Sequence, residues 1–272
     1  MTYCSTLILN WRMNKIMKKP LNVLSIDWDY FIDATLEQRM TLFPDGNDTL
    51  GSELNKIIWQ SRYAENEELS RIKYDEEAFN GMMDYLYRVR KNYKSPYVKV
   101  MITNSHKHIY DFVTKNSDKD RPIRMFHIDY HTDSYGFQAE LDCGNWVDHL
   151  NKYLYDRARK FSTIQWLGRE DSEAIIGSPK LLQQTEIDGC IERTVDKFFH
   201  GEIPDLIFIC KSNPWSPPHL DSYFDKMFGI AKKIGHVWYT NFIENRYTDE
   251  FKSNYKELRK AYESIRKPFE GV

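Results

Sequence analysis

Short, continuous apolar runs punctuate the chain, and between them apolar residues recur every three or four positions. A continuous run is typical of a strand buried on both faces of a sheet, whereas the wider spacing is typical of a helix with one buried face. We interpret as strands the runs Leu21–Ile26, Val98–Ile102, Pro122–Ile128, Thr163–Leu167 and Leu206–Cys210. The periodic stretches predict helices over Asp75–Arg90, Asn145–Tyr155, Leu220–Lys233 and Thr248–Ile265.

Strands that alternate with helices at this scale predict a three-layer α/β/α fold with a mostly parallel central sheet. The length of 272 residues and the hydrophobic content of 41% suit a single domain over residues 1–272. Two polar regions, 35–66 and 168–204, interrupt the alternation, and we predict that they are insertions or lids. Residues 1–20 are expected to form a flexible N-terminal extension, with an apolar patch too short for a signal peptide or a membrane span.

Composition narrows the classes of partner. The formal net charge of -2, from 38 basic and 40 acidic residues, gives no bulk attraction to nucleic acid or to an anionic membrane. Four scattered cysteines do not make a disulfide framework, so we expect a reducing, cytoplasmic environment. The glycine-rich phosphate-binding patterns are absent, which leaves nucleotide binding without support. No pattern in the chain predicts an oligomeric state.

Acidic residues follow two of the predicted strands at the point where each strand ends. Asp27 and Asp29 close the first run, and Asp129, His131 and Asp133 close the third. Carboxylates two residues apart at a strand end project to the same side, and ligand sites of parallel sheets lie beyond the carboxyl ends of the strands. The two motifs therefore predict one site.

A histidine turn after the second strand completes the candidate metal site. His106 lies closer to the strand end than His108 does, so we prefer His106 and keep His108 as the alternative. The predicted ligands are Asp27, Asp29, His106, Asp129, His131 and Asp133. Oxygen and nitrogen ligands without a thiolate near either motif favour manganese or iron over zinc, calcium or magnesium, and six ligands can hold two ions with a bridging hydroxide. We predict two manganese(II) ions per chain.

Each motif also has an ordinary structural explanation. Asp27 could cap the turn after the first strand, and Asp129 and Asp133 could lie in a polar turn that caps a helix. His127, within the third strand, is predicted to be a hydrogen-bonded core histidine rather than a ligand.

The segments Ser25-x-Asp27-x-Asp29 and Asp129-x-His131-x-Asp133 resemble the two metal-binding signatures of the arginase and deacetylase superfamily. In arginases the second of these segments precedes the first, so the motif order here is permuted. That order resembles an arginase-like branch that includes the peptide arginases of ribosomal peptide pathways. The resemblance spans roughly residues 21 to 220, and its elements are Asp27-Trp28-Asp29-Tyr30-Phe31, Ser105-His106, His127-Ile128-Asp129-Tyr130-His131-Thr132-Asp133 and Ser212-Asn213-Pro214-Trp215. Asn213 departs from the pattern of the branch.

The resemblance implies a manganese-dependent hydrolase that converts arginine residues of a precursor peptide into ornithine and releases urea. The predicted catalytic residues are His149, as proton donor to the leaving amine, and the metal ligand Asp129. The predicted substrate-binding residues are Asn145, Trp146, Ser212 and Asp33. Glu140, Asp142 and Trp215 are further candidates for contact with the guanidinium group.

Four other functions fit parts of the pattern. The site could serve a metabolic ureohydrolase acting on free arginine or an agmatine-like substrate, or a deacylase of the same superfamily. A phosphatase of the haloacid dehalogenase type would use Asp27 as nucleophile and Asp29 as acid, but it would leave the Asp129 motif unused. The last alternative is a metal-stabilised module that binds a peptide without catalysis.

Overall fold

Seven parallel strands form the central sheet of the computed structural model, which describes residues 18–44, 51–92, 98–118, 120–136, 140–156, 162–172, 182–240 and 245–266. The strands are β1 (Leu21–Asp27), β4 (Lys99–Thr103), β5 (Ile123–Ile128), β6 (Thr163–Leu167), β7 (Leu182–Gln184), β8 (Leu206–Cys210) and β9 (His236–Thr240). Their order is β7-β6-β5-β1-β8-β4-β9, and each neighbouring pair is parallel. The three-layer α/β/α fold predicted from the alternating pattern is confirmed.

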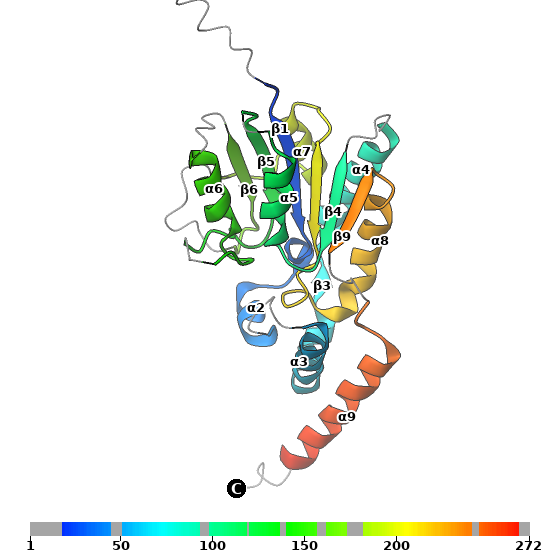
Figure 1. Cartoon of the computed structure of the whole chain (residues 1–272). Helices are drawn as coiled ribbons and strands as arrows, with labels where there is room; N and C mark the ends of the chain where they lie inside the picture. The colour runs from blue at the N-terminus through cyan, green and yellow to red at the C-terminus, as the bar shows by residue number, and fades with distance from the viewer. Residues whose placement is uncertain are drawn as a thin grey trace, which may run out of the picture.

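The central strand β1 is buried on both faces, which is why its sequence is almost continuously apolar. Val23 packs into a core with α5 (His108–Asn116) and α6 (Trp146–Asp156). Leu24 and Ile26 face the other way, into a core with α4 (Glu76–Asn92), α7 (Ile191–Phe199) and α8 (Asp221–Ala231). Figure 1 shows α5 in front of the sheet and α7 behind it.

Two helices lie beyond the carboxyl ends of the strands. They are α2 (Leu36–Leu42) and α3 (Ser52–Glu65), both within the predicted insertion 35–66, and Figure 1 shows them below the sheet. Trp59 of α3 donates a hydrogen bond of 2.9 Å to the carbonyl oxygen of Asn213, in the loop after β8. The insertion therefore contacts the edge at which the candidate ligands were predicted.

The remaining elements lie at this edge or beyond it. They are the 3-10 helices η1 (Trp28–Phe31), η2 (Glu67–Arg71) and η3 (Pro218–Leu220), the antiparallel pair β2 (Ile32–Asp33) and β3 (Lys73–Tyr74), and α9 (Asp249–Arg266). α9 extends away from the sheet and packs on α3, where the rings of Tyr63 and Phe251 meet edge to face with centroids 5.6 Å apart. Within the described part of the chain, no helix is both long enough and apolar enough to cross a membrane.

The predicted boundaries agree closely with the structure for the five strands and four helices, but not elsewhere. The second predicted insertion, 168–204, supplies the edge strand β7 and the helix α7, whose Ile191, Val195 and Phe199 are buried. This region is thus partly built into the three layers of the domain. Of the expected N-terminal extension, 1–17 lie outside the described residues.

Candidate metal centre

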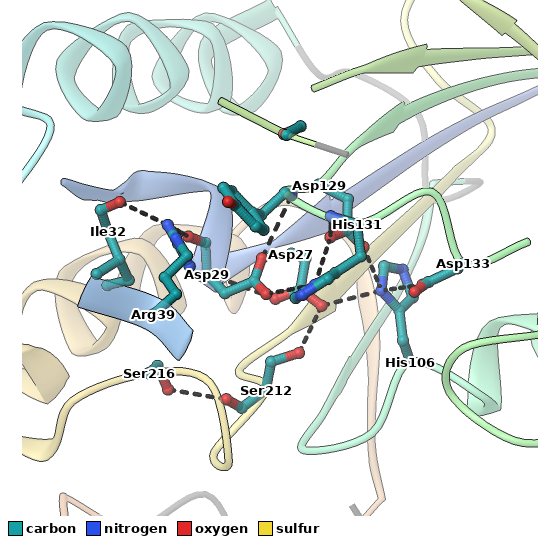
Figure 2. A network of polar contacts seen from close by, with 12 residues as sticks. Asp27, Asp29, Ile32, Arg39, His106, Asp129, His131, Asp133, Ser212 and Ser216 are labelled. Atoms are coloured by element: carbon teal, nitrogen blue, oxygen red, sulfur yellow. Dashed lines mark hydrogen bonds and ion pairs between the residues drawn. The ribbon is translucent and has the colours of Figure 1, made fainter. Parts of the chain in front are cut away.

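The six predicted ligands converge at the carboxyl edge of the sheet. Asp27 ends β1, and Asp29 lies in η1 directly after it. His106 follows β4, and the Asp129 motif follows β5. Because β4, β1 and β5 run in the same direction, their ends deliver these side chains to one place. Figure 2 shows them pointing toward one another, with His106 and Asp133 on one side of the cluster and Asp29 on the other.

The first ligand group surrounds Nδ1 of His106. This nitrogen lies 2.9 Å from Oδ2 of Asp27, 3.0 Å from Oδ2 of Asp129 and 3.1 Å from Oδ2 of Asp133. The other ring nitrogen of His106 lies 2.8 Å from the hydroxyl of Ser25. A hydrogen bond from Nε2 to Ser25 would leave the lone pair of Nδ1 facing three carboxylate oxygens, an arrangement that a metal cation between them would stabilise.

The second ligand group surrounds His131. Its Nδ1 lies 2.9 Å from Oδ2 of Asp29 and 3.7 Å from Oδ1 of Asp129. Asp129 therefore presents one oxygen to each histidine and links the two groups. A carboxylate shared in this way is the expected bridge between two cations.

The spacing of the ligand atoms suits divalent metal ions. In an octahedral shell with metal–ligand distances of about 2.1 Å, adjacent ligand atoms lie about 3.0 Å apart. The three contacts of 2.9 to 3.1 Å around His106 have this length. The triads Asp29–Asp129–His131 and His106–His127–Asp129 each place one ligand atom per residue close enough to share an ion. The residues present can therefore hold a metal, and their oxygen and nitrogen donors suit manganese among other ions.

A thiol also lies at the site, contrary to the sequence-based expectation that none is near. Cys210 forms a third possible ligand triad with Asp27 and His106. It escaped notice because it is remote in sequence, at the end of β8, which pairs with β1 in space. Burial, together with the charges of Asp27 and Asp129, holds the pKa of the Cys210 thiol well above its usual value. Zinc prefers the thiolate, so this cysteine adds little to the case for zinc.

The cluster of carboxylates attracts positive charge. Burial raises the pKa of Asp27 to about 7, and the charges of Asp29 and Asp129 add to the effect. Burial alone would lower the pKa of His106, but Asp133, Asp129 and Asp27 hold it well above its usual value. Metal cations would relieve the same repulsion.

Hydrogen bonds from nearby backbone N–H groups orient the ligand side chains. The backbone N–H of Asp29 donates to Oδ1 of Asp27 over 3.0 Å, and that of His131 donates to Oδ1 of Asp129 over 2.7 Å. Asp133 and Ser212 have positive φ angles of 50° and 49°, which residues other than glycine adopt rarely. Strained residues of this kind cluster at functional sites, and here both touch the ligand cluster.

Two predicted substrate-binding residues are buried and donate hydrogen bonds to the candidate ligands. Trp146 is fully buried, donates its indole N–H to Oδ2 of Asp133 and stacks on the His106 ring with centroids 5.2 Å apart. Ser212 donates its hydroxyl to Oδ2 of Asp27 over 2.5 Å. Complete burial closes the Trp146 ring to a substrate, so its role is to position Asp133 and His106.

The structure does not bring the other predicted substrate-binding residues into the cluster. The Asn145 side chain donates to the carbonyl oxygen of Glu140 and accepts from the backbone N–H of Asp142, each over 2.9 Å, so it holds the loop before α6. Asp33 lies exposed at the end of β2, where its carboxylate is 3.3 Å from Arg169. A predicted contact of either residue with a substrate has no support from these positions.

His149, the predicted proton donor, lies in the second turn of α6. Its ring packs edge to face against Tyr110 of α5, with centroids 6.2 Å apart. This position is in the interface between α5 and α6. The general-acid role of His149 stays a prediction.

His131 is the most exposed of the six ligands. The His131 side chain is 25% exposed, whereas the side chains of the other ligands are at most 8% exposed. The Trp215 ring lies beside it, with centroids 5.9 Å apart. His108, the alternative ligand, begins α5, whereas His106 occupies the cluster.

Sequence reasoning missed several supporting residues. Ser25 contacts His106, and the indole N–H of Trp166 donates to the carbonyl oxygen of Asp129 over 3.0 Å. Arg39 of α2 donates to the carbonyl oxygen of Asp29 over 3.1 Å. His127 is in the core as predicted, but neither ring nitrogen is hydrogen-bonded to another described residue. Only Ser25 carried a signal, because it belongs to the segment Ser25-x-Asp27-x-Asp29.

Comparisons with protein-family models, with curated proteins and with solved structures found no match to this chain.

Proposed function

We propose that this protein is a metal-dependent hydrolase that cleaves the guanidinium group of arginine residues in a peptide, giving ornithine and urea. The observation that carries the proposal is the place of Asp129, which presents its two oxygens to two separate histidines. A shared carboxylate between two ligand groups favours a pair of ions over one. The choice of arginine as substrate rests on the resemblance of the motifs to peptide arginases.

The ligands divide into two sets. His106, Asp27, Asp129 and Asp133 would hold one manganese ion, and His131, Asp29 and Asp129 would hold the other. When bound, the two ions would lower the pKa of a water molecule so that it is nucleophilic at neutral pH. Ser25 and Trp146 hold His106 and Asp133 in place through their hydrogen bonds.

The exposure of His131 favours the approach of a substrate on its side of the cluster. A guanidinium group entering beside His131 would pass the Trp215 ring, and the face of such a ring attracts cations. Hydrolysis forms a carbon–oxygen bond at the guanidinium carbon and breaks the bond to the side-chain nitrogen of ornithine. That nitrogen must take up a proton as it leaves, and His149 remains the predicted donor.

One alternative is weakened by the contacts of Asp27. A phosphatase of the haloacid dehalogenase type needs Asp27 as a nucleophile. One oxygen of this carboxylate accepts from the backbone N–H of Asp29, and the other accepts from Ser212 and lies 2.9 Å from His106. A carboxylate held on both oxygens is poorly placed to attack a phosphorus atom.

The test is urea release by manganese-loaded protein from an N-acetylated, C-amidated peptide with one arginine. Mass spectrometry should show the loss that accompanies conversion of that arginine to ornithine. Free arginine and agmatine are assayed in parallel, and the Asp129→Asn protein is the inactive control. Urea from free arginine alone would replace the proposal with a metabolic ureohydrolase. No urea from any of these, with manganese bound, would contradict the assignment to guanidinium hydrolysis.

A further inference from the structure

His127 is a buried imidazole whose polarity has no explanation in the core. Its side chain is 0% exposed, yet neither ring nitrogen has a hydrogen-bond partner among the described residues. An unsatisfied buried polar group destabilises the folded state. When a folded protein keeps such a group, a bound ion or a functional role at the site is a common explanation.

The surroundings of the ring are largely aromatic. Trp146 meets His127 edge to face with centroids 4.9 Å apart, and His106 does so at 5.1 Å. On the flanking strands the residues in register with His127 are Ser25 and Trp166. Phenylalanine would fill this space without leaving polar atoms unpaired, so packing does not account for a histidine here.

One polar group does face the ring. Nε2 of His127 lies 3.5 Å from Oδ2 of Asp129, which also has no hydrogen bond of good geometry in the described residues. This is the oxygen that Asp129 directs at His106. A potential donor and an acceptor, both buried and both without a good hydrogen bond, therefore lie a small rotation apart.

We propose that His127 is a positioning residue that donates a hydrogen bond from Nε2 to Oδ2 of Asp129 and so orients the carboxylate shared by the two ligand groups. Residues that hydrogen-bond to metal-ligating carboxylates fix their direction, and losing one typically lowers metal affinity about 10- to 100-fold. The inference rests on the metal site of the proposed function and is independent of the substrate.

The experiment compares His127→Phe and His127→Gln with the native protein by calorimetric titration of manganese and by thermal unfolding without metal. The His127→Phe protein should bind manganese about 10- to 100-fold more weakly. Its Tm without metal should change little, because the lost hydrogen bond to Asp129 is offset by removal of the buried Nδ1, which has no partner among the described residues. Glutamine retains an N–H donor and should recover most of the affinity. If His127 had only a structural role, its replacement would not lower the affinity for manganese while leaving the Tm without metal nearly unchanged.

His219→Phe is the matched control. His219 is a largely buried histidine whose ring nitrogens contact the hydroxyl of Tyr63 and, over 2.7 Å, the carbonyl oxygen of Ile72. Its replacement should lower the Tm and leave manganese affinity unchanged, the reverse of the result expected for His127→Phe.

Three results would overturn the inference. Unchanged affinity in His127→Phe would show that the hydrogen bond does not form or does not matter. Weaker binding accompanied by a fall in Tm without metal as large as that of His219→Phe would assign His127 to the core alone. A fall from two bound ions to one in both His127 variants would make His127 a ligand instead. If the native protein binds no manganese, the metal site fails together with this inference, whereas manganese binding without urea release contradicts only the proposed reaction.

Discussion

The guanidinium carbon of Arg39 lies 3.7 Å from the centroid of the Tyr130 ring. This contact joins helix α2, beyond the carboxyl edge of the sheet, to the residue between Asp129 and His131. Arg39 is buried and also donates to the backbone carbonyl oxygens of Asp29 and Ile32, over 3.1 and 2.7 Å. A single side chain thus joins the backbone at Asp29 to the ring of Tyr130, the residue before His131.

Replacing Arg39 by methionine should weaken the binding of one manganese ion more than that of the other. The variant keeps an apolar stem but loses both the hydrogen bonds that fix the turn at Asp29 and the charge over Tyr130. We expect about a tenfold loss of affinity for the ion held by Asp29 and His131. Titration with manganese at limiting protein concentration should resolve this as a second, weaker binding step.

Arg88→Met is the control for Arg39→Met. Arg88 is a half-buried arginine that pairs with the carboxylates of Glu192 and Asp196 and so joins α4 to α7, away from the ligand cluster. Its replacement should leave both binding steps unchanged. An equal loss at both steps in Arg39→Met would mean that Arg39 supports the fold as a whole.

Replacement of single ligands should change the number of bound ions in a pattern set by the shared carboxylate. Asp129 contacts both histidines, whereas Asp133 contacts only His106 and Asp29 only His131 among the ion pairs of the described cluster. Asp129→Asn should therefore bring bound manganese close to zero, and Asp29→Asn or Asp133→Asn should each leave about one ion per chain. Elemental analysis after dialysis measures the ratio, and circular dichroism checks that each variant is folded. Equal losses in all three would contradict the division into two groups.

Removal of manganese should destabilise the native protein. At a manganese concentration of about 100 times Kd, each bound ion adds about 2.7 kcal/mol to the stability of the folded state, so two ions correspond to a rise in Tm of about 10 to 20 °C for a domain of this size. The Asp129→Asn protein should not show this rise in Tm with manganese. Without metal its Tm should fall below that of the native protein, because, although burial opposes the charge of Asp129, the contacts with His106 and His131 hold the pKa of Asp129 well below its usual value, so the charged form stabilises the folded state. Thermal unfolding with manganese and with a chelator tests both statements.

The parts of the fold that the sequence predicted are those with an unambiguous burial pattern. β1 and β8 are buried on both faces, so their runs are continuous, and α4 presents one apolar stripe over several turns. α5 was missed because it begins at His108, directly after the ligand turn, and is short. The edge strand β7 has one buried residue in three, which leaves no pattern to recognise.

The candidate ligands were predictable because each motif is local in sequence and lies at a strand end. The residues that support them were not, because they depend on which strands are neighbours. Cys210 and Ser212 reach Asp27 only because β8 pairs with β1, and Arg39 reaches Tyr130 only through the path of α2. Trp146 was predicted at the site, but its role there depends on complete burial, which a sequence motif does not carry.

Two buried cations share one carboxylate beside the candidate site. Nζ of Lys211 lies 3.0 Å from Oδ2 of Asp221, and Arg246 pairs with the same carboxylate over 2.7 Å. Lys211 is fully buried, and burial lowers its pKa to about 8, although Asp221 favours the charged form. The folded state therefore releases the lysine proton at a lower pH than the unfolded state does.

This difference predicts that the stability contributed by Lys211 rises with pH. Between about pH 8 and the ordinary lysine value of 10.5, the unfolded chain binds more protons than the folded chain, so deprotonation favours folding. Below about pH 8 both states are charged and the burial penalty is present in full. Relative to Lys211→Met, the free energy of unfolding of the native protein should increase by about 1 to 3 kcal/mol across this window. Urea unfolding of both proteins without metal, at several pH values from 7.5 to about 10.5, measures the difference. A constant difference would mean that Lys211 keeps its proton in both states, held by Asp221 more strongly than burial opposes it.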